Sequence, residues 1–236
     1  HLHPKFRADI FVPCGGRPAS VNINNWKAWL DEDGKPRFKA VIEGANLFLT
    51  QDARLKLEEK GVILYKDASS NKGGVTSSSL EVLSSLVMTD KEWDDLMCVK
   101  GEIEPEFRQR YIKEILETIR GNARREFEII WQENARKGIP RAILTDLISE
   151  KINVIKDSIR ESDLFHDRDL LKKVIEVGVP KSLIELVGVD RFLNNLPENY
   201  LRALFASRLA APYVYAHGLD ANEVDFYRFI EDFKKS

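Results

Sequence analysis

The chain has 236 residues, of which 43% are hydrophobic and 31% are charged, and its formal net charge at pH 7 is −2. This balance is that of a globular protein with one large or two small domains, and it gives no basic field for binding nucleic acid. No apolar run approaches the roughly 18 residues of a membrane span. Two isolated cysteines, Cys14 and Cys98, make no disulfide framework and favour a reducing compartment.

The amino terminus gives a hint about the origin of the chain. It starts at His1 without an initiator methionine, and the first residues contain no apolar region of a signal peptide. We therefore expect either a processed chain or a fragment of a longer one.

Residues 1 to about 88 contain three short apolar runs, at 8–12, 38–42 and 62–65, each followed by a polar or Gly-rich turn. Continuous apolar runs bounded by turns are typical of buried parallel strands. A short helix is expected over 22–30 and a longer one over 50–60, with Thr50 as its N-cap and Gly61 just past its end. Strands that alternate with helices in this way predict a parallel α/β sheet.

From about residue 90 the pattern becomes helical. Pro105 suits a first helical turn, and a long apolar stripe follows until Gly138 and Pro140 end it. A second stripe runs from Leu144 to Ile159. Shorter helices are predicted near 168–177, 181–187, 198–216 and 222–234, with no strand after residue 90.

The turns that follow the three predicted strands are the most informative feature of the sequence. In an open parallel sheet, ligands bind beyond the carboxyl ends of the strands. Glycine permits positive φ and lets a backbone approach a ligand closely. Each turn could be merely tight, but three such turns in succession favour a binding site at this edge of the sheet.

The third turn is the richest of the three. Residues 71–81 read Asn-Lys-Gly-Gly-Val-Thr-Ser-Ser-Ser-Leu-Glu, so two glycines precede four hydroxyl residues and an apolar helix. Backbone amides and hydroxyls gathered at a helix start form a site for a carboxylate or a phosphate. Plain N-capping is the alternative, but it needs only one hydroxyl.

Together these motifs resemble a known enzyme family. Glu-Gly-Ala-Asn at 43–46, followed by the pattern Asn71-x-Gly-Gly-Val-x-x-Ser78-x-x-Glu81, resembles the glutamate, leucine, phenylalanine and valine dehydrogenases. Residues 15–18, 43–50 and 69–79 look more closely like the large NAD-specific glutamate dehydrogenases, particularly those of fungi. The resemblance is detailed over residues 6–88 and weaker over the helical remainder.

The resemblance implies roles for seven residues. It places Asn46 and Asn71 near the nicotinamide and its ribose, where amides can both donate and accept. Ser78 matches a serine that binds the side-chain carboxylate of glutamate. The expected NAD-binding residues are Gly15, Gly16, Asn46 and Asn71, and the expected substrate-binding residues are Gly73, Gly74 and Ser78. Lys72 stands where the smaller enzymes have alanine, and its role is unassigned, with a solvated or phosphate-facing lysine as the default.

Other candidate groups favour ordinary structural roles. Cys14 could be imagined as a nucleophile, but no histidine is linked to it by sequence pattern. His166 and His217 lie in helical surroundings and suit surface or capping positions better than metal ligation, so no metal site is expected. The basic residues between 108 and 125 alternate with Glu, which is typical of a solvated helix face with i,i+4 pairs.

Parts of a complete dehydrogenase are missing. There is no Gly-x-Gly-x-x-Gly turn for the pyrophosphate, and the resemblance implies that the catalytic lysine and aspartate lie upstream. We expect the second half of a Rossmann-like parallel sheet in a partial NAD-binding domain, residues 1–90, followed by a mostly α-helical region, residues 91–236. Residues 8–12 would then form an edge strand, exposed or covered by a partner chain.

The resemblance implies a function for the parent polypeptide. It would be an oxidoreductase that uses NAD to convert L-glutamate to 2-oxoglutarate and ammonia, with this chain supplying one wall of the cleft. The isolated chain is expected to be inactive. A non-catalytic assembly or regulatory module derived from such an enzyme is the alternative. The expected partners are the rest of the dehydrogenase chain and further copies in a homo-oligomer, in the cytoplasm, with the mitochondrial matrix left open.

Overall fold

The computed structural model describes residues 5–235, so the start of the chain at His1 lies outside the described residues. The chain forms two compact units, each built from two separate stretches of sequence. Unit 1 contains the chain up to Lys72 together with Ala123–Ser149. Unit 2 contains Gly73–Asn122 and the chain from Glu150 onward.

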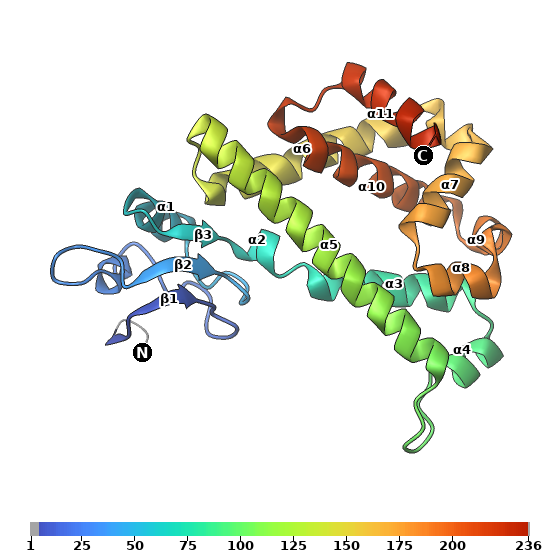
Figure 1. Ribbon diagram of the computed structural model, residues 1–236, viewed down its shortest axis with the longest axis horizontal. Coiled ribbons are helices and arrows are strands. Elements are labelled where there is room, and N and C mark those ends of the chain that lie inside the picture. Colours follow the sequence, from blue (N-terminus) through green and yellow to red (C-terminus); the bar gives the residue numbers. More distant parts are fainter. Residues whose placement is uncertain (1–4, 236) are drawn as a thin grey trace. The chain divides into compact units, whose positions relative to one another are not determined.

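Unit 1 contains a parallel sheet of three strands, β1 (Ala8–Phe11), β2 (Phe38–Ile42) and β3 (Ile63–Tyr65). The strand order is β1-β2-β3, with Phe11 opposite Val41 and Val41 opposite Leu64. Figure 1 shows the three arrows pointing in the same direction. The predicted α/β class and the three predicted strands are therefore confirmed.

The core of unit 1 combines aromatic and aliphatic side chains. The Phe11 ring lies 5.0 Å from both Trp29 and Phe38, centroid to centroid, and Val41 and Leu64 are buried. Helix α1 (Gln51–Glu59) begins as predicted. Its N-cap, Thr50, accepts a hydrogen bond from the Ala53 amide over 3.4 Å.

The helix expected over 22–30 is much shorter. Only η2 (Trp26–Trp29) forms, and it is a 3₁₀-helix. Asn22 Oδ1 accepts from the Asn24 amide over 3.0 Å, and Asn25 Oδ1 accepts from the Asn22 amide over 2.8 Å. Asparagine side chains that bond to nearby backbone compete with the helical pattern, which explains why the helix does not start earlier.

Strand β1 forms one edge of the described sheet. Ile10 is 60% exposed, and Phe6 and Val12 are exposed beside it. Strands of parallel sheets are normally buried, so apolar side chains exposed along β1 are unusual for such a sheet. The exposed edge predicted for the isolated chain is therefore present.

The remaining elements are helical, and no further strand follows β3 in the part of the chain that the structure describes. The α-helices are α2 (Asp67–Ser70), α3 (Gly73–Val87), α4 (Asp90–Leu96), α5 (Glu106–Lys137), α6 (Arg141–Glu161), α7 (Arg168–Gly178), α8 (Lys181–Val187), α9 (Val189–Asn195), α10 (Glu198–His217) and α11 (Glu223–Lys235), joined by the 3₁₀ turns η3 (Asp163–His166) and η4 (Gly218–Asp220). The long predicted helices are all found, whereas α2, α4 and α9 were not predicted.

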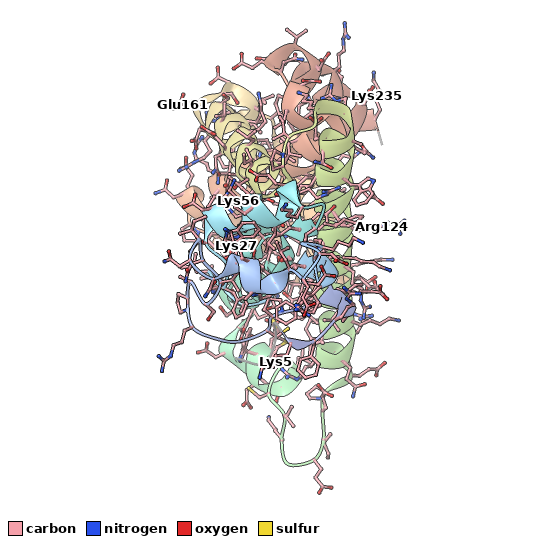
Figure 2. All side chains as sticks on the ribbon, turned by 90° about the vertical axis from the view of Figure 1, so that its left-hand side faces the viewer. Lys5, Lys27, Lys56, Arg124, Glu161 and Lys235 are labelled. Carbon is pink, nitrogen blue, oxygen red and sulfur yellow. The ribbon has the colours of Figure 1, made fainter. Side chains whose placement is uncertain are left out.

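Helix α5 carries the basic face noted in the sequence. Arg124 pairs with Glu128 over 2.9 Å and Arg108 pairs with Glu104 over 3.0 Å, both with i,i+4 spacing. Figure 2 shows Arg124 extending outward from the helix. The prediction of a solvated face with i,i+4 pairs is confirmed.

Unit 2 has a core of its own. Tyr213 of α10 is fully buried, and its hydroxyl bonds to the Asn222 carbonyl, which ties α10 to the start of α11. Phe205 meets Phe165 edge to face at 5.8 Å. No helix among residues 5–235 is long and apolar enough to cross a membrane.

Candidate functional site

The three loops that follow the strands of unit 1 are hydrogen-bonded to one another in order. The Ala45 amide, after β2, donates to the Pro13 carbonyl, after β1, over 2.7 Å. Asn71, after β3, donates from Nδ2 to the Gly44 carbonyl over 3.3 Å. The predicted convergence of the loops at the carboxyl edge of the sheet is thus seen in the structure.

Asn46 and Asn71 meet at this edge. Asn71 Nδ2 donates to Asn46 Oδ1 over 2.5 Å. Asn46 is exposed and accepts through Oδ1, so its own Nδ2 remains available to donate to a ligand. Two side chains that lie 25 positions apart in sequence therefore present one amide surface at the end of β2 and β3.

The path of the loop after β1 depends on Gly16. Gly16 has a φ of +128°, and a Cβ there would lie 2.8 Å from Phe48 Cε2, whereas a Cβ at Gly15 would meet nothing within 4 Å. Gly44 in the next loop lies against Cys14, because its Cβ would be 3.2 Å from the cysteine Sγ. Gly16 is therefore required by its backbone conformation, Gly44 is closely packed, and Gly15 has neither constraint.

A buried ionic network lies behind these loops and was not predicted. Glu43 is fully buried and accepts from Arg54 Nε over 2.7 Å and from Arg54 Nη2 over 3.0 Å. Arg54 Nη2 also donates to Asp67 Oδ1 over 3.1 Å. The two carboxylates in turn accept backbone amides of the 46–50 segment: Leu49 bonds to Glu43 and Leu47 bonds to Asp67. Arg54 thus holds the loop that carries Asn46.

The charge state of Glu43 reflects two opposed effects. Burial raises the pKa of Glu43, and the hydrogen bonds from the Arg54 guanidinium counteract part of that rise. A buried carboxylate needs a cation with good geometry, and the two-point contact with Arg54 supplies it. A glutamate at the end of a buried apolar strand is the one sequence signal for this network.

The segment from β3 to Lys72 is tied to helices α5 and α6 of unit 1. Tyr65 stacks on Phe127 at 4.8 Å, and Lys66 Nζ donates to Asp146 Oδ1 over 2.7 Å. Lys72 Nζ donates to Glu126 Oε1 over 2.6 Å. Lys72 therefore does not extend freely into solvent.

The predicted substrate-binding residues lie on α3, in unit 2. Helix α3 begins at Gly73, so Gly73 and Gly74 are its first residues and Ser78 lies in its second turn. Ser78 is exposed, and its Oγ donates to the Val75 carbonyl over 3.1 Å. The expectation that the helix starts after the hydroxyl residues is wrong, and so Ser78 is not a cap. A Cβ at Gly73 would lie only 3.4 Å from Ile119, which indicates close packing of α3 on α5.

Two tyrosines hold α3 from other helices of unit 2. Tyr111 of α5 is buried and donates to the Leu80 carbonyl over 2.6 Å. Tyr200 of α10 reaches the Ser79 carbonyl over 3.4 Å. The helical region therefore supports the helix that carries Ser78.

The remaining candidates have surface or structural roles. Cys14 is an exposed free thiol, and His217 bonds through Nδ1 to the Tyr213 carbonyl over 2.9 Å at the end of α10. Among residues 5–235, no group of three or more His, Cys, Asp and Glu side chains could hold a metal ion.

Comparison with known proteins places these motifs in a family. Residues 3–138 match the family Glutamate/Leucine/Phenylalanine/Valine dehydrogenase. The chain is 52% identical over 235 residues to Glutamate dehydrogenase 2 of Dictyostelium discoideum, with 100% of this chain and 23% of that protein covered. It is 45% identical over 232 residues to the NAD-specific glutamate dehydrogenase of Neurospora crassa, with 98% of this chain and 22% of that protein covered.

A third relative has the same pattern of coverage. The NAD-specific glutamate dehydrogenase of Saccharomyces cerevisiae is 40% identical over 233 residues, with 96% of this chain and 21% of that protein covered. The chain spans only about a fifth of the length of the curated relatives it matches. No solved structure matches the chain.

Proposed function

Because the chain belongs to the glutamate/leucine/phenylalanine/valine dehydrogenase family, we propose that it forms part of an NAD-dependent glutamate dehydrogenase. The parent polypeptide would oxidise L-glutamate to 2-oxoglutarate and ammonia. The relatives that cover the whole chain support this activity by their names, and two of the three described above are named as NAD-specific.

The observation that carries the proposal is the amide pair at the carboxyl edge of the sheet. Asn71 Nδ2 bonds to Asn46 Oδ1, and the Asn46 amide nitrogen remains available to donate. A carboxamide ligand needs both a donor and an acceptor, and ligands of open parallel sheets bind at this edge. The residues present therefore fit the nicotinamide end of NAD.

We assign the other residues by the same logic. Gly15 and Gly16, in the loop after β1, would let the nicotinamide half of the cofactor pass close to the backbone. Ser78, with Gly73 and Gly74 at the start of α3, would bind the distal carboxylate of glutamate, since a helix start and a hydroxyl both favour an anion. The Ser78 hydroxyl would exchange its bond to the Val75 carbonyl for one to the carboxylate. When bound, the nicotinamide supplies the hydride acceptor for the glutamate Cα. This chain contributes orientation, on which rate depends strongly.

The proposal requires the remainder of a longer polypeptide. The pyrophosphate turn and the catalytic lysine and aspartate would come from upstream sequence, whose strands would pair with the exposed edge of β1. We retain residues 1–90 as the partial NAD-binding domain and residues 91–236 as the helical C-terminal region. A homo-oligomeric assembly in the cytoplasm completes the proposal.

The test compares two proteins in an NADH absorbance assay with glutamate and NAD. The full-length polypeptide should turn over, and the 236-residue chain alone should not. Robust turnover by the isolated chain would contradict the assignment of the acid-base groups to upstream sequence. An inactive full-length polypeptide that still forms a defined assembly would instead favour a non-catalytic module.

A further inference from the structure

We infer that Lys72 is a positioning residue. Through Glu126 it ties the loop after β3, which carries Asn71, to helix α5. This inference rests on the proposed function and names a role for a residue that the motif itself leaves unassigned. Lys72, Glu126 and the loops that they join all belong to unit 1.

The contact joins a half-exposed cation to a buried anion. Lys72 Nζ lies 2.6 Å from Glu126 Oε1, and the Glu126 side chain is 4% exposed whereas that of Lys72 is 43% exposed. A carboxylate taken out of water is strongly disfavoured unless a cation and hydrogen bonds compensate it. The Lys72 ammonium group is therefore held at α5 by Glu126.

The same short segment is held by α5 at its other end. Phe127, the residue after Glu126, stacks on Tyr65 at 4.8 Å, and Tyr65 Oη donates to the Phe127 carbonyl over 3.4 Å. Adjacent residues of one helix therefore fix both Tyr65, at the end of β3, and Lys72. The backbone between these two positions has little freedom to shift along the sheet edge.

The contact restricts the position of Asn71, the immediate neighbour of Lys72. Its amide group bonds to the Gly44 carbonyl and to Asn46 Oδ1, so its position sets the geometry of the amide pair. A hydrogen-bonded pair is sensitive to small displacements, and a misplacement of about 1 Å can lower a rate by as much as a hundredfold. An anchor one peptide bond away from Asn71 is well placed to prevent such a displacement.

Helix α5 offers a matched control one heptad further on. Arg136 Nη2 lies 2.6 Å from Glu133 Oε1, and the side chains are 51% and 4% exposed, respectively. This contact has the same length and the same combination of half-exposed cation and buried carboxylate. It differs from the Lys72 contact in two ways: neither partner adjoins a site residue, and Glu133 Oε2 also lies 3.5 Å from Lys137 Nζ.

The experiment uses the full-length enzyme with Lys72→Met, Lys72→Arg, Glu126→Gln, the double variant Lys72→Met/Glu126→Gln, and Arg136→Met. Melting temperature, the dissociation constant of NADH by fluorescence, and kcat and KM for glutamate are measured for each. We expect Lys72→Met to weaken NADH binding and to lower kcat, each by about tenfold. Lys72→Arg should retain most of both, and the double variant should be no worse than Lys72→Met alone.

The control separates positioning from stability. Arg136→Met should lower the melting temperature, although Lys137 remains beside Glu133, while leaving NADH binding and kcat close to those of the wild type. Equal kinetic effects in Lys72→Met and Arg136→Met, or wild-type NADH binding in Lys72→Met, would overturn the positioning role. If Asn46→Ala and Asn71→Ala also bind NADH like the wild type, the cofactor assignment fails. If those two lose binding while Lys72→Met keeps it, only the role of Lys72 fails.

Discussion

Asn71 donates a hydrogen bond from Nδ2 to Oδ1 of Asn46 over 2.5 Å, which joins the loops after β3 and β2. Asn46 accepts this bond through its oxygen, which leaves its amide nitrogen to donate to a ligand. The two residues should therefore act as a unit in any function that the loops serve.

Asn46→Ala in the full-length enzyme should lower kcat about tenfold or more while changing the melting temperature little, because Asn46 is exposed. The double variant Asn46→Ala/Asn71→Ala should lose little beyond the worse single variant, since coupled residues are not additive. Asn24→Ala, an exposed asparagine in the loop before η2, is the control. Wild-type kcat and wild-type KM for NAD in Asn46→Ala would remove Asn46 from the site.

Ser78→Ala should reduce kcat/KM for glutamate by roughly ten- to a hundredfold, because a hydrogen bond to a charged group is worth about 1.5–3 kcal/mol. The effect should shrink for norvaline, which lacks the distal carboxylate. Ser85→Ala is a close control on the same helix, since its exposed hydroxyl donates to the Val82 carbonyl over 2.8 Å in the same i−3 geometry. Equal losses on the two substrates would show that Ser78 does not contact the carboxylate.

Gly16→Ala should destabilise the 236-residue chain by about 1–3 kcal/mol, because φ at this position is +128° and the new Cβ would crowd Phe48. Gly15→Ala should change the free energy of unfolding by no more than about 0.5 kcal/mol, since its Cβ would enter open space. Denaturant unfolding of both variants checks this, and equal tolerance at the two positions would contradict a role for Phe48 in selecting glycine.

Arg54→Met should destabilise the chain by about 3–5 kcal/mol at neutral pH, because it leaves the buried Glu43 carboxylate without its guanidinium. Lys56→Met, which breaks only the exposed pair with Glu59, should cost about 0–1 kcal/mol. Urea unfolding of the two variants measures the difference. A loss in Arg54→Met as small as that in Lys56→Met would show that the network contributes little.

The Arg54→Met variant should also change how stability depends on pH. Burial already raises the pKa of Glu43, and removing Arg54 removes the hydrogen bonds that lower it. A carboxyl whose pKa is higher in the folded state keeps its proton on folding, so stability falls as pH rises from the unfolded pKa through the folded one. The deficit of Arg54→Met relative to the wild type should therefore shrink as the pH is lowered toward 4.5, the ordinary Glu value. A deficit that grows in acid would contradict this.

The strands and long helices could be predicted because their signals are local. Runs such as 38–42 are apolar and bounded by turns, and Thr50 is an ordinary N-cap. Helix α4, which was not predicted, also has a local signal, because Thr89 and Glu92 form a capping box. The start of α3 has none, since Gly73 and Gly74 have low helix propensity and are helical where Gly73 packs against Ile119.

The site could be predicted in part for the same reason. Parallel topology brings the carboxyl ends of neighbouring strands together, so the approach of Asn46 and Asn71 followed from the order of the strands. The contacts of Lys72 with Glu126 and of Lys66 with Asp146 join positions 54 and 80 residues apart. No spacing rule connects such positions, and only the folded chain shows them.

The second stretch of unit 1, Ala123–Ser149, follows in sequence the segment Gly73–Asn122, which belongs to unit 2. During synthesis, the sheet strands therefore leave the ribosome well before Glu126, Phe127 and Asp146, which contact the end of β3 and the segment after it. Until then, the apolar and charged groups at that segment lack the helices that cover them. A chain that ended between Lys72 and Ala123 would lack the second stretch of unit 1. A truncated protein meant to isolate the sheet therefore has to retain the chain through Ser149.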